Sequence, residues 1–316
     1  MILPKLVGRA VFVFSDPGGA KPLLALADSL YGKLSEIRLI SDREYSFYEG
    51  FNVKVNKPDA TAYDTLQKYM PDFVLTATSY TSQIELNYIE AAKGLSIPVY
   101  SFVDHWTSIR ERFNFEGKEF LPDQILVIDE KAKLIGINQG VSSDILNVFG
   151  NPYYEYLRNW KPSISKSEFL TSIGIEDVGK KIVVFAPDPL SNRGGIGKYG
   201  FDEVTATEKI NMVVDKLTDV YQFIIKPHPN QHTEILKKIV HPDFTLISSD
   251  TDTNILIYHS NIVIGFFSNF LIEASLFKKI VIRFLPELKV ADPLSDSQIG
   301  TLIYNTEELE KSLTKP

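Results

Sequence analysis

IIKPHPNQH (residues 224–232) and GFFSNFLIEASLF (residues 265–277) are the two stretches from which the fold can be predicted. Each has an apolar run typical of a buried strand, and each run stops abruptly at polar residues suited to hold an anion or a sugar. Ligands of open α/β sheets bind at the carboxyl ends of the strands. Two such endings about forty residues apart therefore predict one ligand site in the C-terminal half.

The rest of the chain alternates short apolar runs with segments of helical spacing. The runs expected to be strands are 10–14, 36–41, 73–78, 98–106, 125–129 and 145–152, and then 180–189, 221–226, 244–248, 261–265 and 279–284. Helices are expected at 62–70, 82–95, 130–140, 202–218 and 268–277. This alternation predicts the α/β class, with parallel sheets and one Rossmann-like unit in each half.

A turn, Gly-Asn-Pro at 150–152, marks the expected domain edge. The stretch 153–179 is aromatic and polar without a strand period, as expected for a connector, and KKIVVFAPDP (180–189) restarts the pattern. We therefore expect an N-terminal domain at 1–152, a connector at 153–179 and a C-terminal domain at 180–316.

Composition excludes several classes of protein. The net charge is −7 and the chain has no cysteine. An acidic chain argues against generic nucleic-acid binding, and the lack of cysteine excludes disulfides, thiolate zinc sites and cysteine nucleophiles. The apolar run of about six residues before Asp16 is too short for a secretion signal or a membrane span. We expect a cytoplasmic protein, and leave peripheral contact with the inner face of the membrane open.

KPHP (226–229) places two cationic or donor side chains, Lys226 and His228, at a strand end stiffened by Pro227 and Pro229. Such groups can neutralise a departing phosphate. The alternative is that His228 only caps a turn. His228 and His232 also have the i,i+4 spacing of a zinc site, but Pro229 interrupts the helix and no glutamate follows His228, so we predict no metal.

In the second stretch, Ser268 or Asn269 is the expected N-cap of a helix, with Glu273 one turn further on. The cap hydroxyl and the free amides of a helix start can hold a phosphate, and Glu273 can accept hydrogen bonds from ribose hydroxyls. The alternative is an ordinary amphipathic helix with a polar cap.

SNRGGIGKYG (191–200) carries three glycines in GxGxxG spacing, but the preceding strand ends several residues earlier. We predict a flexible loop over the ligand cleft, with Arg193 and Lys198 as phosphate ligands. A solvated loop without a ligand is the alternative.

The first strand ends in SDPGG (15–19), followed by a helical pattern. A strand, a glycine turn and a helix start expose free amides to an anion, here near Gly18 and Gly19. The alternative is a tight turn. Asp16, at the tip of this strand, is a candidate general base.

DHW (104–106) supplies the rival candidates at another strand end. His105 or Asp104 is suited to act as a general base and Trp106 to stack on a sugar. Equally, Asp104 can cap and Trp106 can pack.

These motifs resemble those of a known superfamily. The layout is similar to the GT-B glycosyltransferase fold, and FGNP (149–152) resembles the domain-end turn of lipid A disaccharide synthase-like and UDP-GlcNAc 2-epimerase-like proteins. IIKPHPNQ with GFFSNFLIEASLF resembles CDP-glycerol glycerophosphotransferases, bacterial sialyltransferases and Kdo transferases of capsule synthesis. The resemblance implies two Rossmann-like domains with parallel sheets facing across a cleft. It also implies that His228, Pro229, Ser268 and Glu273 bind the phosphate and ribose of a donor.

The expected function is transfer of a sugar from a CMP-, CDP- or UDP-linked donor to an envelope or polysaccharide acceptor, either a glycan or a lipid-linked one. The C-terminal domain would hold the donor and the N-terminal domain the acceptor. Lys226 and His228 would stabilise the leaving phosphate, and Asp16 or His105 would deprotonate the acceptor, with inversion and with no bound metal or cofactor. One alternative is a nucleotide-sugar 2-epimerase-like enzyme, although SDPGG stands where such proteins carry Arg-Pro-Glu. Another is a non-catalytic binding or assembly subunit.

Overall fold

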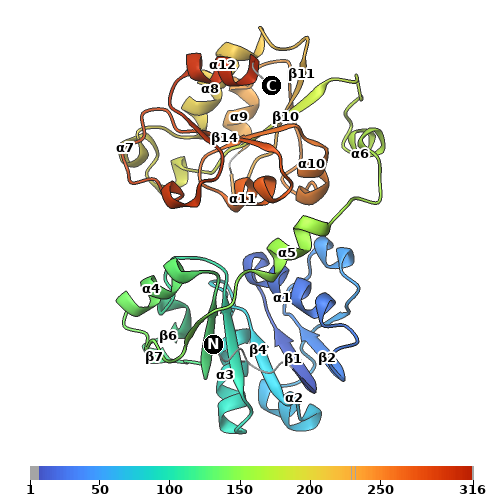
Figure 1. The fold of residues 1–316 in the computed structure, drawn as a ribbon, viewed down its shortest axis with the longest axis vertical. Helices are drawn as coiled ribbons and strands as arrows, with labels where there is room; N and C mark the ends of the chain where they lie inside the picture. Colours follow the sequence, from blue (N-terminus) through green and yellow to red (C-terminus); the bar gives the residue numbers. More distant parts are fainter. Residues whose placement is uncertain (1–6, 229, 232, 315–316) are drawn as a thin grey trace. The chain divides into compact units, whose positions relative to one another are not determined.

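The computed structural model describes residues 7–228, 230–231 and 233–314. The chain divides into two compact units, Met1–Tyr156 and Leu157–Pro316 (Figure 1). We call them the N-terminal unit and the C-terminal unit, and each is described by itself.

The N-terminal unit is built on a seven-stranded sheet in the order β3-β2-β1-β4-β5-β8-β9, with every pair parallel. The strands are β1 (Arg9–Val13), β2 (Glu36–Ile40), β3 (Val55–Asn56), β4 (Phe73–Thr76), β5 (Val99–Val103), β8 (Gln124–Val127) and β9 (Leu146–Val148). The strand order reverses its direction between β1 and β4. Polar groups that follow these two strands therefore lie at the switch point, where open α/β sheets bind ligands.

Helices and short turns connect these strands. They are α1 (Pro17–Ser29), η1 (Ser46–Gly50), α2 (Ala62–Tyr69), α3 (Ile84–Gly94), η2 (Glu111–Phe113), α4 (Glu130–Asn138) and the hairpin of β6 (Asn114–Phe115) with β7 (Lys118–Glu119). The division between the two units falls inside α5 (Pro152–Asn159). The limits of the domains and of the connector stay a prediction.

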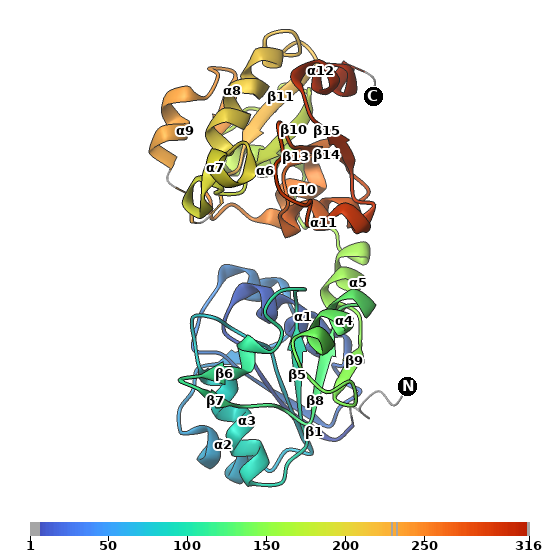
Figure 2. The same ribbon diagram turned by 90° about the vertical axis from the view of Figure 1, so that its left-hand side faces the viewer.

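The C-terminal unit has a six-stranded parallel sheet in the order β12-β11-β10-β13-β14-β15 (Figure 2). The strands are β10 (Lys181–Ala186), β11 (Tyr221–Ile225), β12 (Phe244–Leu246), β13 (Ile262–Gly265), β14 (Ile280–Phe284) and β15 (Thr301–Ile303). The helices are α6 (Lys166–Ser172), η3 (Ser191–Arg193), α7 (Gly195–Tyr199), α8 (Glu203–Val214), α9 (Thr233–Ile239), α10 (Thr253–His259), α11 (Asn269–Leu276), η4 (Ser295–Ser297) and α12 (Thr306–Thr314).

Both faces of this second sheet are buried, which explains why its strands are apolar without alternation. Successive side chains of a strand point to opposite faces. Val183 and Phe185 of β10 belong to a core cluster with residues of α8 and α12, whereas Ile182 and Val184 belong to one with residues of α6 and α10. The prediction of an α/β protein with parallel sheets is confirmed.

Residues 191–200 differ from the expected flexible loop, because they form η3 and α7. Backbone geometry explains their glycines. Gly194 has φ +106° between the two helical turns, and Gly200 has φ +89° after α7. A Cβ at Gly200 would lie 1.9 Å from the carbonyl oxygen of Glu287, whereas Gly197 has open space around it.

Among the described residues, none of the helices combines the length and the apolar character required to cross a bilayer.

Candidate functional site

Both opening stretches reach the carboxyl edge of the C-terminal sheet. Lys226 and His228 follow β11, and Ser268 follows β13. β10 lies between these two strands and ends just before Asp188. The three strand ends thus meet at the switch point of this sheet, where β10 has β11 on one side and β13 on the other.

Lys226 is only 7% exposed, and its Nζ donates to the carbonyl oxygen of Ser249 at 2.8 Å. This bond ties the end of β11 to the loop after β12. The predicted phosphate ligand thus has a structural partner within the unit.

His228 is half-buried, and its ring makes a local hydrogen bond that fixes its tautomer. Its Nδ1 accepts from the backbone amide of Asn230 at 3.1 Å. Burial lowers the pKa of His228, and the positive charges of Arg193 and Lys226 lower it further. The neutral ring therefore carries its proton on Nε2 and can donate it to an anionic oxygen. Pro229, predicted to bind the same ligand, lies outside the described residues.

Ser268 precedes α11 but does not cap it with its side chain. A serine at this position usually accepts a hydrogen bond from an amide of the first helical turn. Here its Oγ is shielded from solvent and has no hydrogen-bond partner among the described residues. Asn269 is exposed at the first position of α11, and Glu273 is buried one turn further along.

Asp188 is a member of this edge that the sequence analysis did not single out. Its Oδ2 accepts from the backbone amide of Phe267 at 2.9 Å, and the amide of Ser268 acts on the same carboxyl group. Burial raises the pKa of Asp188 to about 6, against the opposing effects of these amides and of Arg193. Its position just after an apolar strand indicates a place at the sheet edge. The neighbouring residues in the sequence, however, do not indicate that its side chain is buried.

A hydrogen bond joins the helical segment 191–199 to this edge. In it, Asn192 Nδ2 donates to the carbonyl oxygen of Asn230 at 3.0 Å. Arg193 and Lys198 are exposed, and Lys198 Nζ lies 5.0 Å from the centre of the Tyr199 ring. Neither side chain makes an ion pair with the described residues. Both remain proposed phosphate ligands.

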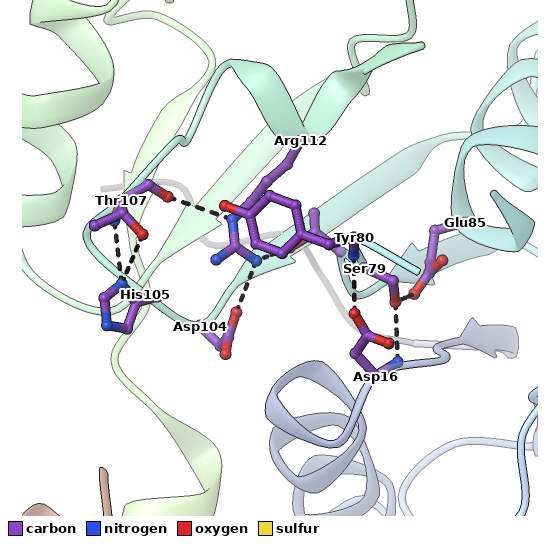
Figure 3. A network of polar contacts seen from close by, with 9 residues as sticks. Asp16, Ser79, Tyr80, Glu85, Asp104, His105, Thr107 and Arg112 are labelled. Atoms are coloured by element: carbon purple, nitrogen blue, oxygen red, sulfur yellow. Dashed lines mark hydrogen bonds and ion pairs between the residues drawn. The ribbon is translucent and has the colours of Figure 1, made fainter. Parts of the chain in front are cut away.

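In the N-terminal unit, Asp16 fastens the end of β1 to the loop after β4 (Figure 3). Its backbone amide donates to Ser79 Oγ at 3.0 Å, and its Oδ2 accepts from the amide of Tyr80 at 2.8 Å. The hydroxyl of Thr81 donates to its Oδ1. The proposed base is thus already an acceptor for its own neighbours.

The same hydroxyl of Ser79 donates to Glu85, in the first turn of α3 (Figure 3). Glu85 is 2% exposed, and its Oε2 has no hydrogen-bond partner among the described residues. Burial raises the pKa of Glu85 to about 7, and nearby Asp16 and Asp42 contribute in the same direction.

Arg112 and Asp104 form a second polar group at this edge (Figure 3). Arg112 Nη1 donates to Asp104 Oδ1 at 3.1 Å and to Thr78 Oγ1 at 3.0 Å, and the guanidinium lies 4.6 Å from the centre of the Tyr80 ring. A Cβ at Gly18 would lie 2.3 Å from Asp104 Oδ2. Glycine is thus needed for close packing, and the adjacent carboxylate argues against an anion at this turn.

Gly19 and Trp106 also have packing roles. A Cβ at Gly19 would lie 2.5 Å from the Cβ of Ala77. The indole of Trp106 packs against the core of this unit, and its Nε1 donates to Asp129 Oδ2 at 2.8 Å.

His105 lies beside this group, and its Nδ1 accepts from the backbone amide of Thr107 at 3.2 Å (Figure 3). Burial lowers the pKa of His105, against the effect of the Asp104 charge. Like His228, the neutral ring carries its proton on Nε2.

Within the described residues, one cluster has the composition of a metal site, namely Asp215, His241 and Asp243. Asp215 Oδ1 lies 3.0 Å from Nε2 of His241, and Asp243 Oδ2 lies 3.5 Å from Nδ1. The two carboxylates therefore flank opposite nitrogens of the ring, which pairs them with the imidazole rather than directing all three groups at one ion.

No family model and no curated protein matches this chain. Solved structures do match it. The S. aureus MnaA–UDP co-structure is 18% identical, with a TM-score of 0.68 over 98% of this chain and 87% of that one. A putative UDP-N-acetylglucosamine 2-epimerase from Listeria monocytogenes is 16% identical, with a TM-score of 0.70 over 98% and 88%. UDP-GlcNAc 2-epimerase from Neisseria meningitidis, bound to UDP-GlcNAc, is 16% identical, with a TM-score of 0.60 over 97% and 91%.

At these identities the likeness shows a shared fold, and it confirms the expected two-domain GT-B architecture. It also corrects the expected function. Several neighbours are named as UDP-GlcNAc 2-epimerases, which contradicts the expected glycosyltransferase and gives no support to the families with a KPHP motif. The 2-epimerase-like alternative fits these neighbours better, although the chain lacks Arg-Pro-Glu.

Proposed function

We propose that the chain binds a nucleotide sugar at the carboxyl edge of its C-terminal sheet and epimerises the sugar without an acceptor. The observation that supports this best is the pair of donors at neighbouring strand ends, His228 Nε2 and the Ser268 hydroxyl, in a fold shared with structures that hold UDP or UDP-GlcNAc. A nucleoside diphosphate is the ligand class that this arrangement suits.

In this proposal, the diphosphate accepts hydrogen bonds from the Nε2–H of His228, from the Ser268 hydroxyl and from the first free amides of α11. The amino end of a helix favours an anion through both its unpaired amides and its dipole. Arg193 and Lys198 add positive charge from the segment 191–199, and Glu273 remains the proposed partner of the ribose. A cytoplasmic location stays a prediction of the sequence.

Epimerisation at C2 requires that the C2–H bond be broken and re-formed on the opposite face of the sugar. The electron pair of that bond would form a C1=C2 double bond as the nucleoside diphosphate leaves C1, and the diphosphate would add back to C1 when a proton returns to C2. One group must accept a proton and one must return it. Asp16 and His105 remain the proposed groups. His105 holds its ring proton on Nε2 and would donate, while Asp16 would accept.

Two measurements test this function. First, UDP, CDP, CMP and GDP are compared in thermal unfolding, where UDP at about 100 times its Kd should stabilise the protein by about 2.7 kcal/mol. His228→Ala should weaken UDP binding by about 10- to 100-fold, because a hydrogen bond to a charged group is lost. His241→Ala serves as the control, because its ring is paired with Asp215 and Asp243 instead.

Second, UDP-GlcNAc is incubated with the protein in D₂O and followed by proton NMR. Loss of the C2 proton signal and appearance of the C2 epimer are expected. Failure of every nucleotide to stabilise the protein would refute the proposal. Stabilisation by UDP without exchange at C2 would instead leave a nucleotide-sugar-binding protein with no epimerase activity.

A further inference from the structure

The turn at 266–268, between β13 and α11, is held by one side chain from the loop that follows β10 and by one from β14. β10 and β14 pair with β13 on its two sides, with Ala186 and Arg283 both opposite Gly265. A Cβ at Gly265 would lie 2.9 Å from the carbonyl oxygen of Ala186, so the backbone is closely packed here.

On the β10 side, Asp188 accepts a hydrogen bond from the amide of Phe267, and the amide of Ser268 lowers the pKa of the same carboxyl group. These two amides precede α11 and have no partner within that helix. Because a buried unpaired amide is costly, the carboxylate fixes the path of the chain into the helix.

On the β14 side, Arg283 is 2% exposed, and its Nε donates to the carbonyl oxygen of Phe266 at 3.4 Å. The guanidinium also pairs with Asp292 and donates through Nη1 to the carbonyl oxygen of Leu294 at 3.4 Å. A buried guanidinium needs several such acceptors, and this set fixes its plane.

We propose that Asp188 and Arg283 are positioning residues for nucleotide binding. They hold the turn 266–268 from its two sides, and the Ser268 side chain is therefore not required to cap α11. The Ser268 hydroxyl and the first amides of the helix stay available to the phosphate. This inference rests on the proposed function, and it adds two residues that touch the turn rather than the ligand.

The test compares four variants with the wild type, using UDP as the probe in isothermal titration. Asp188→Ala removes both acceptors and should weaken UDP binding by at least about tenfold. Asp188→Asn keeps one acceptor oxygen and should restore part of the affinity. Arg283→Lys keeps the charge beside Asp292 but loses the Nε donor to Phe266, and a loss of affinity is expected here too.

Asp202→Ala is the matched control. Asp202 also accepts from a backbone amide, that of Thr205 at 2.9 Å, but it caps α8. Its loss should lower stability and leave UDP affinity unchanged.

Hydrogen exchange in the free protein separates this inference from the function on which it rests. The amides of 267 and 268 should exchange faster in Asp188→Ala than in the wild type, and not in Asp202→Ala. If the wild type binds UDP and Asp188→Ala binds it equally well, the positioning role is overturned and the proposed function stands. If the wild type does not bind UDP, the proposed function falls, and with it any role in nucleotide binding.

Discussion

Glu85 carries a carboxyl group that burial keeps from ionising at its usual pH. Its pKa is raised from 4.5 to about 7, mainly by burial, while the bond from Ser79 opposes the rise. The folded state therefore retains a proton that the unfolded state has released across this range. The bound proton of Glu85 stabilises the folded state. This contribution to the free energy of unfolding is fully present below pH 4.5 and is lost as the pH rises towards 7. The total loss is on the order of 3 kcal/mol.

Glu85→Gln should remove this dependence on pH, because the amide resembles the protonated acid and carries no charge. At pH 8 the variant should be more stable than the wild type, by up to about 3 kcal/mol. At pH 5 the two proteins should have similar stability. Urea unfolding at both pH values gives the two free energies of unfolding.

Glu203→Gln is the control, and the opposite effect on the free energy of unfolding is expected for it. Glu203 is also a buried glutamate, but its Oε2 accepts from the backbone amide of Ser191 at 2.9 Å and its Oε1 from the hydroxyl of the same residue. The NH₂ group of glutamine would face either the amide or the hydroxyl of Ser191, and two hydrogen-bond donors would then meet. This change should therefore destabilise the protein at both pH values. If Glu85→Gln also destabilised the protein at pH 8, the buried acid would not be the cause of the pH dependence.

The surroundings in these two sheets could be predicted from the sequence for some of these residues and not for others. His228 and Ser268 follow apolar runs directly, so their place at a sheet edge could be expected from the strand pattern. Asp188 follows an apolar run in the same way, but the burial of Asp188 and of Glu85 gave no signal, because it depends on segments far away in the chain. Asp188, for example, meets an amide 79 residues further on.

Among the elements, the segment formed by η3 and α7 shows why spacing alone misleads. Gly195, Gly197 and Gly200 match GxGxxG, yet Gly200 is needed for the backbone at the end of α7 and Gly197 has open space around it. The strands were easier to predict, since most residues of the long ones are apolar, as in β1 (RAVFV) and β10 (KIVVFA). β15 was missed because it has only three residues, and two of them are exposed.

Two substitutions in this segment should therefore differ sharply. Gly200→Ala forces a Cβ against the carbonyl of Glu287 at positive φ, and should destabilise the protein by more than about 1 kcal/mol. Gly197→Ala places a methyl group in open space within α7 and should be neutral or stabilising by up to about 1 kcal/mol. Thermal unfolding measures both, and UDP titration of Gly197→Ala checks the function of the segment. A large loss of UDP affinity in that variant would indicate that the ligand approaches this glycine after all.

At the scale of the whole molecule, the alternation of strands and helices predicted two parallel sheets. The order of the strands could not be predicted, because it depends on which side of β1 or β10 each crossover returns. That order decides the site, since it sets β10 between β11 and β13 and so places Asp188 between the two stretches that the sequence had singled out. Long-range packing thus supplied the residue that local pattern could not.

Each unit also has its own core, which leads to the last prediction. Among the described residues, the buried members of the clusters in the C-terminal unit all lie at or after Phe169, and those of the cluster around Val11 in the N-terminal sheet all lie at or before Leu146. The residues proposed to hold the nucleotide all belong to the C-terminal unit.

A fragment of residues 157–316 should therefore unfold cooperatively by itself and be stabilised by UDP. Calorimetry of this fragment, with and without UDP, measures both effects, and its His228→Ala variant is the control. A folded fragment that UDP fails to stabilise, beside a full chain that UDP does stabilise, would show that the N-terminal unit supplies part of the nucleotide's binding energy.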